Sequence, residues 1–302
     1  MIYHLIQIPN EQDSIIEQLG SKEKFWLMPE AKLFKEGRPG TGENWAEVIS
    51  AEICNLLDIP HAKYEFAQYR DRYGVLTDSI VPKDCALILG NEILAFKKET
   101  GKNEYKRIEY TIENVLYHFR LFENKRLSVK LPTLNDSISK YIKTPLDLFI
   151  GYLLLDALIG NTDRHAENWG LIITLEKRIY LAPTFDHASS LGRELTDDMR
   201  HYKLTTHDSR VDILAYAKKG KSSFFDTERK KRISMLEAFS RAKNMSKYAA
   251  NFWLTKLDNN IKESNIIKIC NKISDQNLMS DVSKEFMTKL LLINKQRILT
   301  GG

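Results

Sequence analysis

Cysteine and long apolar runs are both scarce in this sequence. The only thiols are Cys54, Cys85 and Cys270, and an odd number of widely spaced cysteines argues against a disulfide framework and favours reduced thiols. The most apolar stretch, residues 146–159, is shorter than the ~20 residues that span a bilayer and contains two aspartates. Residues 1–9 have neither the basic start nor the cleavage site of a secretory signal. We therefore expect a cytoplasmic protein with no membrane partner.

Several common site motifs are missing as well. The sequence has no Gly-x-x-x-x-Gly-Lys-Ser/Thr loop, no Gly-x-Gly-x-x-Gly turn and no His-Glu-x-x-His helix. The net charge of +5 is mild, so it permits an anionic ligand without indicating nucleic acid. Two basic stretches, 218–221 and 229–232, lack interleaved aromatic residues apart from Phe224 and Phe225. We interpret them as solvated helix faces and expect no direct nucleic-acid site.

The order of periodic segments predicts an α+β fold with two lobes, like that of protein kinases. Alternating patterns predict strands at 24–28, 31–35, 64–69 and 73–81, and helical spacing predicts a helix at 45–57. These belong to a β-rich small ATP-binding lobe at 1–82. Residues 83–110 are expected to form a hinge and connecting insertion. Residues 111–302 are expected to form a mostly helical catalytic lobe with one hairpin, 171–173 with 179–181.

The most informative motif places Asp163, Asn168 and Asp186 around this hairpin. Phosphoryl transfer from a metal-bound nucleotide needs one carboxylate to position the attacking hydroxyl, and an amide and a second carboxylate to bind Mg²⁺. The hairpin returns the chain to its start, so Asn168 and Asp186 can face one ion. Each residue alone could equally cap a turn or a helix. Together, they predict a catalytic Asp163 and a magnesium site at Asn168 and Asp186.

Two histidines accompany these residues. A zinc hydrolase built from Asp163, His165 and His187 is the rival interpretation. Because neither a His-Glu-x-x-His motif nor paired cysteines occur, we favour a His165 that belongs to the catalytic set with Asp163 and Asn168, packs under the catalytic loop and supports its backbone.

A lysine and a glutamate are expected on the phosphate side. Lys35 shares the inward face of its strand with Leu33, and Glu47 lies in the first turn of the following helix. In kinases, such a lysine contacts the α- and β-phosphates and is held by such a glutamate. Lys32 and Glu52 compete for these two roles.

Two further segments are candidates for nucleotide contacts. The turn Gly20-Ser21-Lys22 would offer backbone amides to phosphate oxygens. The end of the last small-lobe strand would contact adenine. The residues expected there are Asp78, Ile80 and Val81.

The chain resembles the HipA-like serine/threonine kinases, and residues 156–170 and 181–186 carry the resemblance. The run 186–192 is similar to the short, compact members, and the likeness extends over about residues 18–215. It implies ATP and Mg²⁺ as cofactors, Lys35 as the ATP lysine and a protein serine or threonine as acceptor. The resemblance also implies an aminoacyl-tRNA synthetase as a candidate substrate and an antitoxin as a candidate partner. It implies a location in the bacterial cytoplasm, with secretion into a host as the alternative.

Two other functions stay open at this point. One is a catalytically inert kinase-like binding or repressor protein, and the other is a kinase of lipids or small molecules. The intact set of Asp163, Asn168, Asp186 and Lys35 favours an enzyme, because an inert protein has no need of metal ligands.

The hydroxyls near the expected site suggest regulation by autophosphorylation. The candidates are Ser21, Thr41, Ser189 and Ser190, of which we favour Ser21 and Ser189. A phosphate at Ser189 or Ser190 would have Arg193 or Arg200 nearby.

Overall fold

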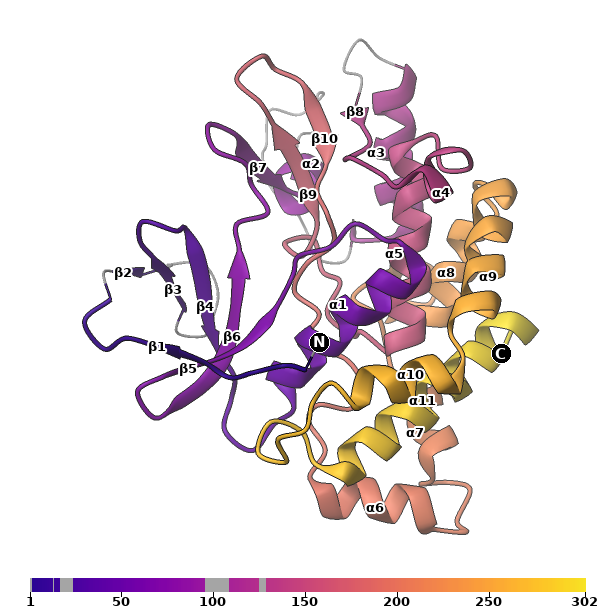
Figure 1. Cartoon of the computed structure of the whole chain (residues 1–302). Coiled ribbons are helices and arrows are strands. Elements are labelled where there is room, and N and C mark those ends of the chain that lie inside the picture. The colour runs from indigo at the N-terminus through magenta and orange to yellow at the C-terminus, as the bar shows by residue number, and fades with distance from the viewer. Residues whose placement is uncertain (1, 13, 17–23, 96–108, 125–128) are drawn as a thin grey trace.

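A six-stranded sheet forms most of the N-terminal part of the molecule (Figure 1). The computed structural model describes residues 2–12, 14–16, 24–95, 109–124 and 129–302. The strands lie in the order β1-β5-β6-β4-β3-β2, with β1 parallel to β5 and the other neighbours antiparallel. Their bounds are Ile6–Ile8 (β1), Ser14–Ile16 (β2), Lys24–Leu27 (β3), Lys32–Glu36 (β4), Glu65–Tyr69 (β5) and Arg72–Asp78 (β6). The predicted strands are present, and the last ends at Asp78 rather than at residue 81.

Helix α1 (Glu43–Leu57) connects β4 to β5 and lies between the sheet and the other helices (Figure 1). Alternation along β4 divides the strand between two environments. Phe34 is fully buried in a small core with Phe25 and Leu76, whereas Leu33 and Lys35 line a cavity on the opposite face. The predicted inward direction of Lys35 follows from this two-residue period.

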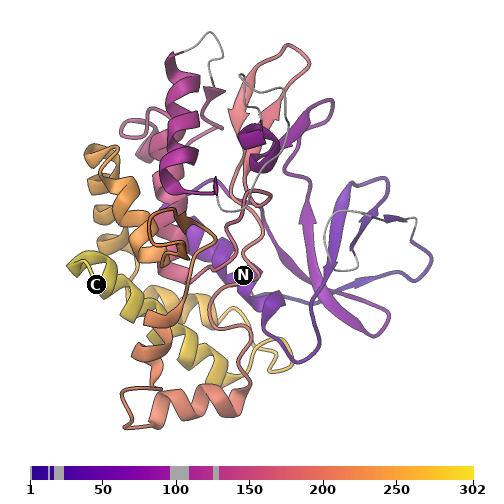
Figure 2. The same ribbon diagram turned by 180° about the vertical axis from the view of Figure 1, so that it is seen from behind.

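The C-terminal part is mostly helical, and the view from behind shows the same separation of sheet and helices (Figure 2). The predicted α+β kinase-like fold is confirmed. The helices are α3 (Ile112–Asn124), α4 (Asp136–Ser139), α5 (Pro145–Ile159), α6 (Asp197–Thr205), α7 (Ile213–Lys219), α8 (Met235–Lys243), α9 (Lys247–Asn260), α10 (Glu263–Cys270) and α11 (Asp281–Thr300). No helix in the described ranges is long and apolar enough to cross a membrane.

Helix α5 is the centre of this part, and all 15 of its residues are buried. Apolar residues surround the helix on every side, as expected for a helix enclosed by others. Thr144 and Asp147 form a reciprocal capping box at its start, and Gly160 ends it in a left-handed conformation, φ 68°. Because α5 is fixed at both ends, the polar loop that follows it begins from a rigid base.

A second, four-stranded sheet flanks this loop, in the order β7-β9-β10-β8. Its strands are β7 (Ala86–Leu89), β8 (Val129–Lys130), β9 (Gly170–Ile173) and β10 (Ile179–Leu181), and β9 with β10 is the predicted hairpin. Strand β7 pairs with β9 and leads into α2 (Gly90–Ala95). The expected connecting insertion, 83–110, therefore contributes ordered structure to this sheet.

The two short strands β11 (Phe225–Asp226) and β12 (Lys231–Arg232) form a separate hairpin before α8. The expectation of a helix face at 229–232 is wrong, because these residues form a turn and a strand.

Candidate active site

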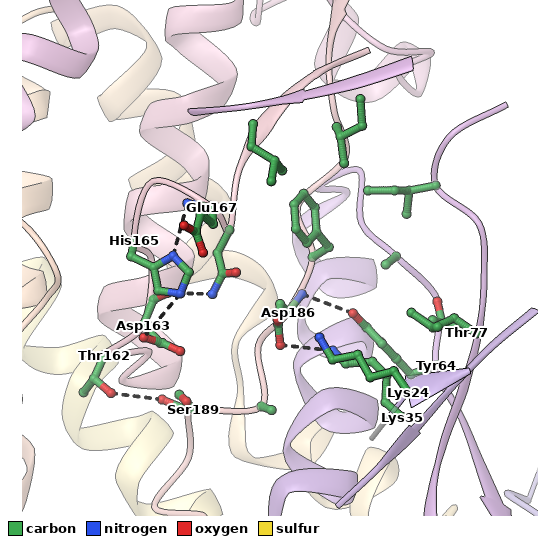
Figure 3. Close-up of a pocket in the computed structure, with 18 of the residues that line it drawn as sticks. Lys24, Lys35, Tyr64, Thr77, Thr162, Asp163, His165, Glu167, Asp186 and Ser189 are labelled. Atoms are coloured by element: carbon green, nitrogen blue, oxygen red, sulfur yellow. Dashed lines mark hydrogen bonds and ion pairs between the residues drawn. The ribbon is translucent and has the colours of Figure 1, made fainter. Parts of the chain in front are cut away.

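A cavity of about 1120 Å³ lies where the six-stranded sheet faces the catalytic loop (Figure 3). Residues of β3, β4 and β6 line one side, and residues 162–168 and 185–189 line the other. Lys35, Asp163, His165, Asn168 and Asp186 all contribute to its wall. The structure thus brings together residues that are up to 151 positions apart in the chain.

Lys35 is held between two carboxylates. Its Nζ donates to Oε1 of Glu47 at 2.6 Å and to Oδ1 of Asp186 at 3.0 Å. Burial alone would lower the pKa of Lys35, but the Asp186 and Glu47 carboxylates outweigh it and hold the pKa well above its ordinary value. The ammonium group is therefore charged at neutral pH and points into the cavity.

Asp186 is fixed by its backbone as well as by this ion pair. Its N–H donates to the Tyr64 hydroxyl at 3.1 Å, and the next amide, of His187, donates to Oε2 of Glu47 at 2.8 Å. Asp186 has a left-handed backbone, φ 58°, which aspartate tolerates better than most residues. Glu47 therefore orients Lys35 and the segment of Asp186 at once.

A buried ion pair holds the catalytic loop, residues 161–168. Arg164, 1% exposed, donates from Nε and Nη2 to the two carboxylate oxygens of Asp156 on α5, each at 2.8 Å. Its Nη1 donates to the carbonyl oxygen of Asn168 at 2.9 Å. Nδ2 of Asn161 donates to the same aspartate at 2.8 Å. Asp156 thus anchors both ends of the loop to the central helix.

These anchors orient Asp163 and Asn168. Oδ1 of Asn161 accepts from the Asp163 backbone N–H at 3.1 Å, and Nδ2 of Asn168 donates to the Asp163 carbonyl oxygen at 2.8 Å. Because Nδ2 of Asn168 donates to the loop backbone, the side-chain oxygen Oδ1 is left to coordinate a cation. The Asp163 side chain is 48% exposed and borders the cavity.

His165 faces the cavity and does not pack under the loop, but it supports the loop backbone as expected. Its Nδ1 accepts from the Glu167 backbone N–H at 3.1 Å, which assigns the ring proton of the neutral tautomer to Nε2. Nε2 lies 3.9 Å from Oδ1 of Asp163 (Figure 3). The imidazole therefore lies beside the Asp163 carboxylate, beyond direct hydrogen-bond distance.

The rival zinc set is not assembled. His187 is fully buried, and its Nε2 is 2.8 Å from the Thr184 hydroxyl. Burial holds the pKa of His187 well below its ordinary value. Within the described ranges, no three His, Cys, Asp or Glu side chains gather closely enough to hold a metal ion.

The competing phosphate-side residues are engaged elsewhere. Lys32 lies 3.6 Å from Asp78 and 3.8 Å from Glu65, and Glu52 accepts from Lys272 at 2.8 Å. The turn Gly20-Ser21-Lys22 lies outside the described residues.

The expected adenine-contacting residues Asp78, Ile80 and Val81 all line the cavity. The N–H of Val81 donates to the Ser79 hydroxyl at 3.1 Å, so this amide is already engaged within its own turn. Sequence reasoning missed several other lining residues, and of the four named next only Phe185, adjacent to Asp186, carried a signal in the sequence. The four are Tyr64, Leu87, Leu89 and Phe185.

No protein-family model matches the chain. The serine/threonine-protein kinase CtkA of Helicobacter pylori (strain J99 / ATCC 700824) is 26% identical over 261 residues, which are 84% of this chain and 70% of that protein. The crystal structure of an H. pylori proinflammatory kinase CtkA matches with a TM-score of 0.70 and 19% identity, covering 98% of this chain and 96% of that one.

A chain from the HipA, HipB and operator DNA complex of Shewanella oneidensis MR-1 matches with a TM-score of 0.48 and 12% identity, over 96% of this chain and 64% of that one. The chain is a relative of CtkA and has the α+β kinase-like fold of that protein.

Proposed function

We propose that this chain is an ATP-dependent serine/threonine protein kinase, which transfers the γ-phosphate of ATP to a protein hydroxyl. The observation that carries the proposal is Lys35, held between Glu47 and Asp186 in the same cavity as Asp163 and Asn168. This is the arrangement that phosphoryl transfer requires. The relationship to a serine/threonine-protein kinase supports the choice of acceptor.

The residues present suit a magnesium ion. The Asn168 amide oxygen and the Asp186 carboxylate are hard oxygen donors, which Mg²⁺ prefers. They would hold the ion, while Lys35 binds the α- and β-phosphates. When bound, Mg²⁺ supplies positive charge that neutralises the phosphate oxygens.

The remaining side chains of the cavity would act on the acceptor hydroxyl and on the adenine. Asp163 orients the acceptor hydroxyl and takes its proton, and His165 borders the same part of the cavity, with Nε2 3.9 Å from Oδ1 of Asp163. Residues 78–81, together with Leu33 and Leu89, would enclose the adenine. An aminoacyl-tRNA synthetase substrate and an antitoxin partner stay predictions from the family resemblance.

Two isosteric variants test the proposal. Asp163→Asn removes the base and should lower phosphoryl transfer by about 10²–10⁴-fold while Mg²⁺–ATP still binds. Asp186→Asn should lower transfer and also weaken Mg²⁺–ATP binding, because it removes a metal ligand. Transfer is measured with labelled ATP and binding by calorimetry. A wild-type protein that binds Mg²⁺–ATP but never transfers phosphate would indicate an inert kinase-like protein, and wild-type turnover in both variants would refute the site.

A further inference from the structure

We infer that the segment carrying the acceptor hydroxyl is an acidic stretch of protein, recognised by Lys219 and Lys221 beside the catalytic loop. This inference rests on the proposed kinase function and adds the class of substrate. It also revises the interpretation of the basic stretch 218–221 as a merely solvated face, since Lys219 and Lys221 line the catalytic cavity.

Hydrogen bonds fix the position of these lysines relative to Asp163. Arg232 of β12 donates from Nη2 to the carbonyl oxygen of Thr162 at 3.1 Å and from Nε to that of Ser222 at 2.6 Å. The Ser223 hydroxyl donates to the same Thr162 oxygen at 3.2 Å. Since Thr162 directly precedes Asp163, the segment that follows α7 is attached to the catalytic loop next to the proposed base.

This attachment is on the acceptor side of the cavity. Figure 3 shows Thr162 and Ser189 beside Asp163, whereas Lys35 and Tyr64 lie across the cavity beyond Asp186. The phosphates are proposed to lie with Lys35, so a protein acceptor must approach Asp163 from the other direction. Residues 219–223 border that direction of approach.

The charges of the lining residues differ between the two sides. Lys35 is neutralised by Glu47 and Asp186, and Arg38 and Arg193 both bind the buried Glu43 carboxylate. By contrast, Lys219 and Lys221 are exposed, and the described residues offer neither ammonium group a carboxylate partner.

The carboxylates of the cavity do not cancel these two charges. Asp186 is bound to Lys35, and Asp78 on β6 lies 3.6 Å from Lys32. Glu167 lies on the α2 side, where it accepts from Asn91 at 3.5 Å. Asp163 is the remaining carboxylate near the acceptor side, and it is proposed to engage the hydroxyl itself. Two cations without a carboxylate partner in the described part of the chain, at the acceptor entrance, favour a ligand that brings negative charge.

The test uses the full chain and three synthetic peptides with one central serine, flanked by acidic, neutral or basic residues. The variant is Lys219→Gln/Lys221→Gln. Its matched control is Lys218→Gln, because Lys218 is exposed in the same last turn of α7 but does not line the cavity. Peptide binding is followed by fluorescence anisotropy, which requires no turnover, and transfer is followed with labelled ATP.

We expect the acidic peptide to bind most tightly and to be the best substrate. The double variant should weaken its binding and raise its KM by about 2- to 10-fold, which corresponds to two solvent-exposed ion pairs, with the KM for ATP unchanged. The difference in affinity between the acidic peptide and the other two should decrease as the salt concentration is raised from about 0.05 M to about 0.5 M, because salt screens exposed charges. Lys218→Gln should behave like the wild type.

Three results would overturn the inference: equal binding of the three peptides, equal affinities of wild type and double variant for the acidic peptide, or a rise in the KM for ATP instead. Selective binding of the acidic peptide without transfer to it or to any other protein hydroxyl would uphold the recognition surface and count against the proposed kinase function.

Discussion

Replacing Arg164 with methionine tests how the catalytic loop is held. Methionine fills much of the same space but carries no charge, so Asp156 would lose both guanidinium contacts while it stays buried at 3% exposure. Removing one partner of a buried ion pair costs about 3–5 kcal/mol. Typical proteins have only about 5–15 kcal/mol of stability, so we expect a large effect, with the melting temperature lower by at least about 6 °C.

A double variant separates charge burial from loop positioning. Asp156→Asn/Arg164→Met removes both charges and keeps an acceptor for Asn161, so the remaining cost should fall to about 1–3 kcal/mol, that of incompletely paired polar groups. Phosphoryl transfer should stay low, because the Asn168 carbonyl has still lost its donor. Thermal and urea unfolding give the stabilities, and labelled ATP gives the activity.

Three outcomes would refute this reasoning. An unchanged melting temperature of Arg164→Met would show that the buried charge of Asp156 does not depend on the Arg164 guanidinium for its stability. A double variant no more stable than the single one would show that charge is not the cause. Wild-type turnover in the double variant would show that the ion pair is structural and does not position Asn168.

The other predictions concern pH and phosphorylation. Burial lowers the pKa of His61 in the folded state, and Nε2 has no partner in the described part of the chain. The folded state therefore binds fewer protons than the unfolded one, so the stabilising contribution is complete above about pH 6.5 and is lost as the pH falls below it. His61→Gln should show a shallower loss of stability between pH 7 and pH 5 in urea unfolding, and an unchanged slope would contradict this. Ser189 lines the cavity, whereas Ser190 is 2% exposed and its hydroxyl donates to the His187 carbonyl at 2.7 Å. After incubation with Mg²⁺–ATP, mass spectrometry should find phosphate on Ser189 and none on Ser190, and the reverse would refute the accessibility argument.

The sequence predicted best where local periodicity decides the structure. The alternation of Leu33, Phe34 and Lys35 gives the direction of each side chain, and the hairpin 170–181 brings Asn168 and Asp186 into one cavity. Strand β7 could not be predicted in this way, because its pairing with β9 joins residues more than 80 positions apart.

The direction of His165 was equally inaccessible from the sequence. It depends on the bond from the Glu167 amide to Nδ1, which follows from the path of the loop and not from any pattern of residue types. The position of Lys219 and Lys221 in the cavity wall likewise depends on long-range hydrogen bonds. These join the Thr162 carbonyl oxygen to Ser223 and Arg232.

Helix α1 has a consequence for how the proposed kinase can be switched off. In many kinases the corresponding helix swings outward and separates its glutamate from the lysine. Here Glu47 binds both Lys35 and the His187 amide, and Ser50 lies 3.1 Å from the Ser190 hydroxyl. An outward swing would therefore break contacts to both sides of the cavity simultaneously.

The far end of α1 is tied down as well. Asp58 at its C-terminus pairs with Lys256 of α9, and the Leu56 carbonyl accepts from Asn260 at 2.7 Å. Contacts therefore hold α1 near its C-terminal end as well as at Glu47 and Ser50. Control of the active site then falls to the segments that border the cavity, where an incoming molecule can act on them directly.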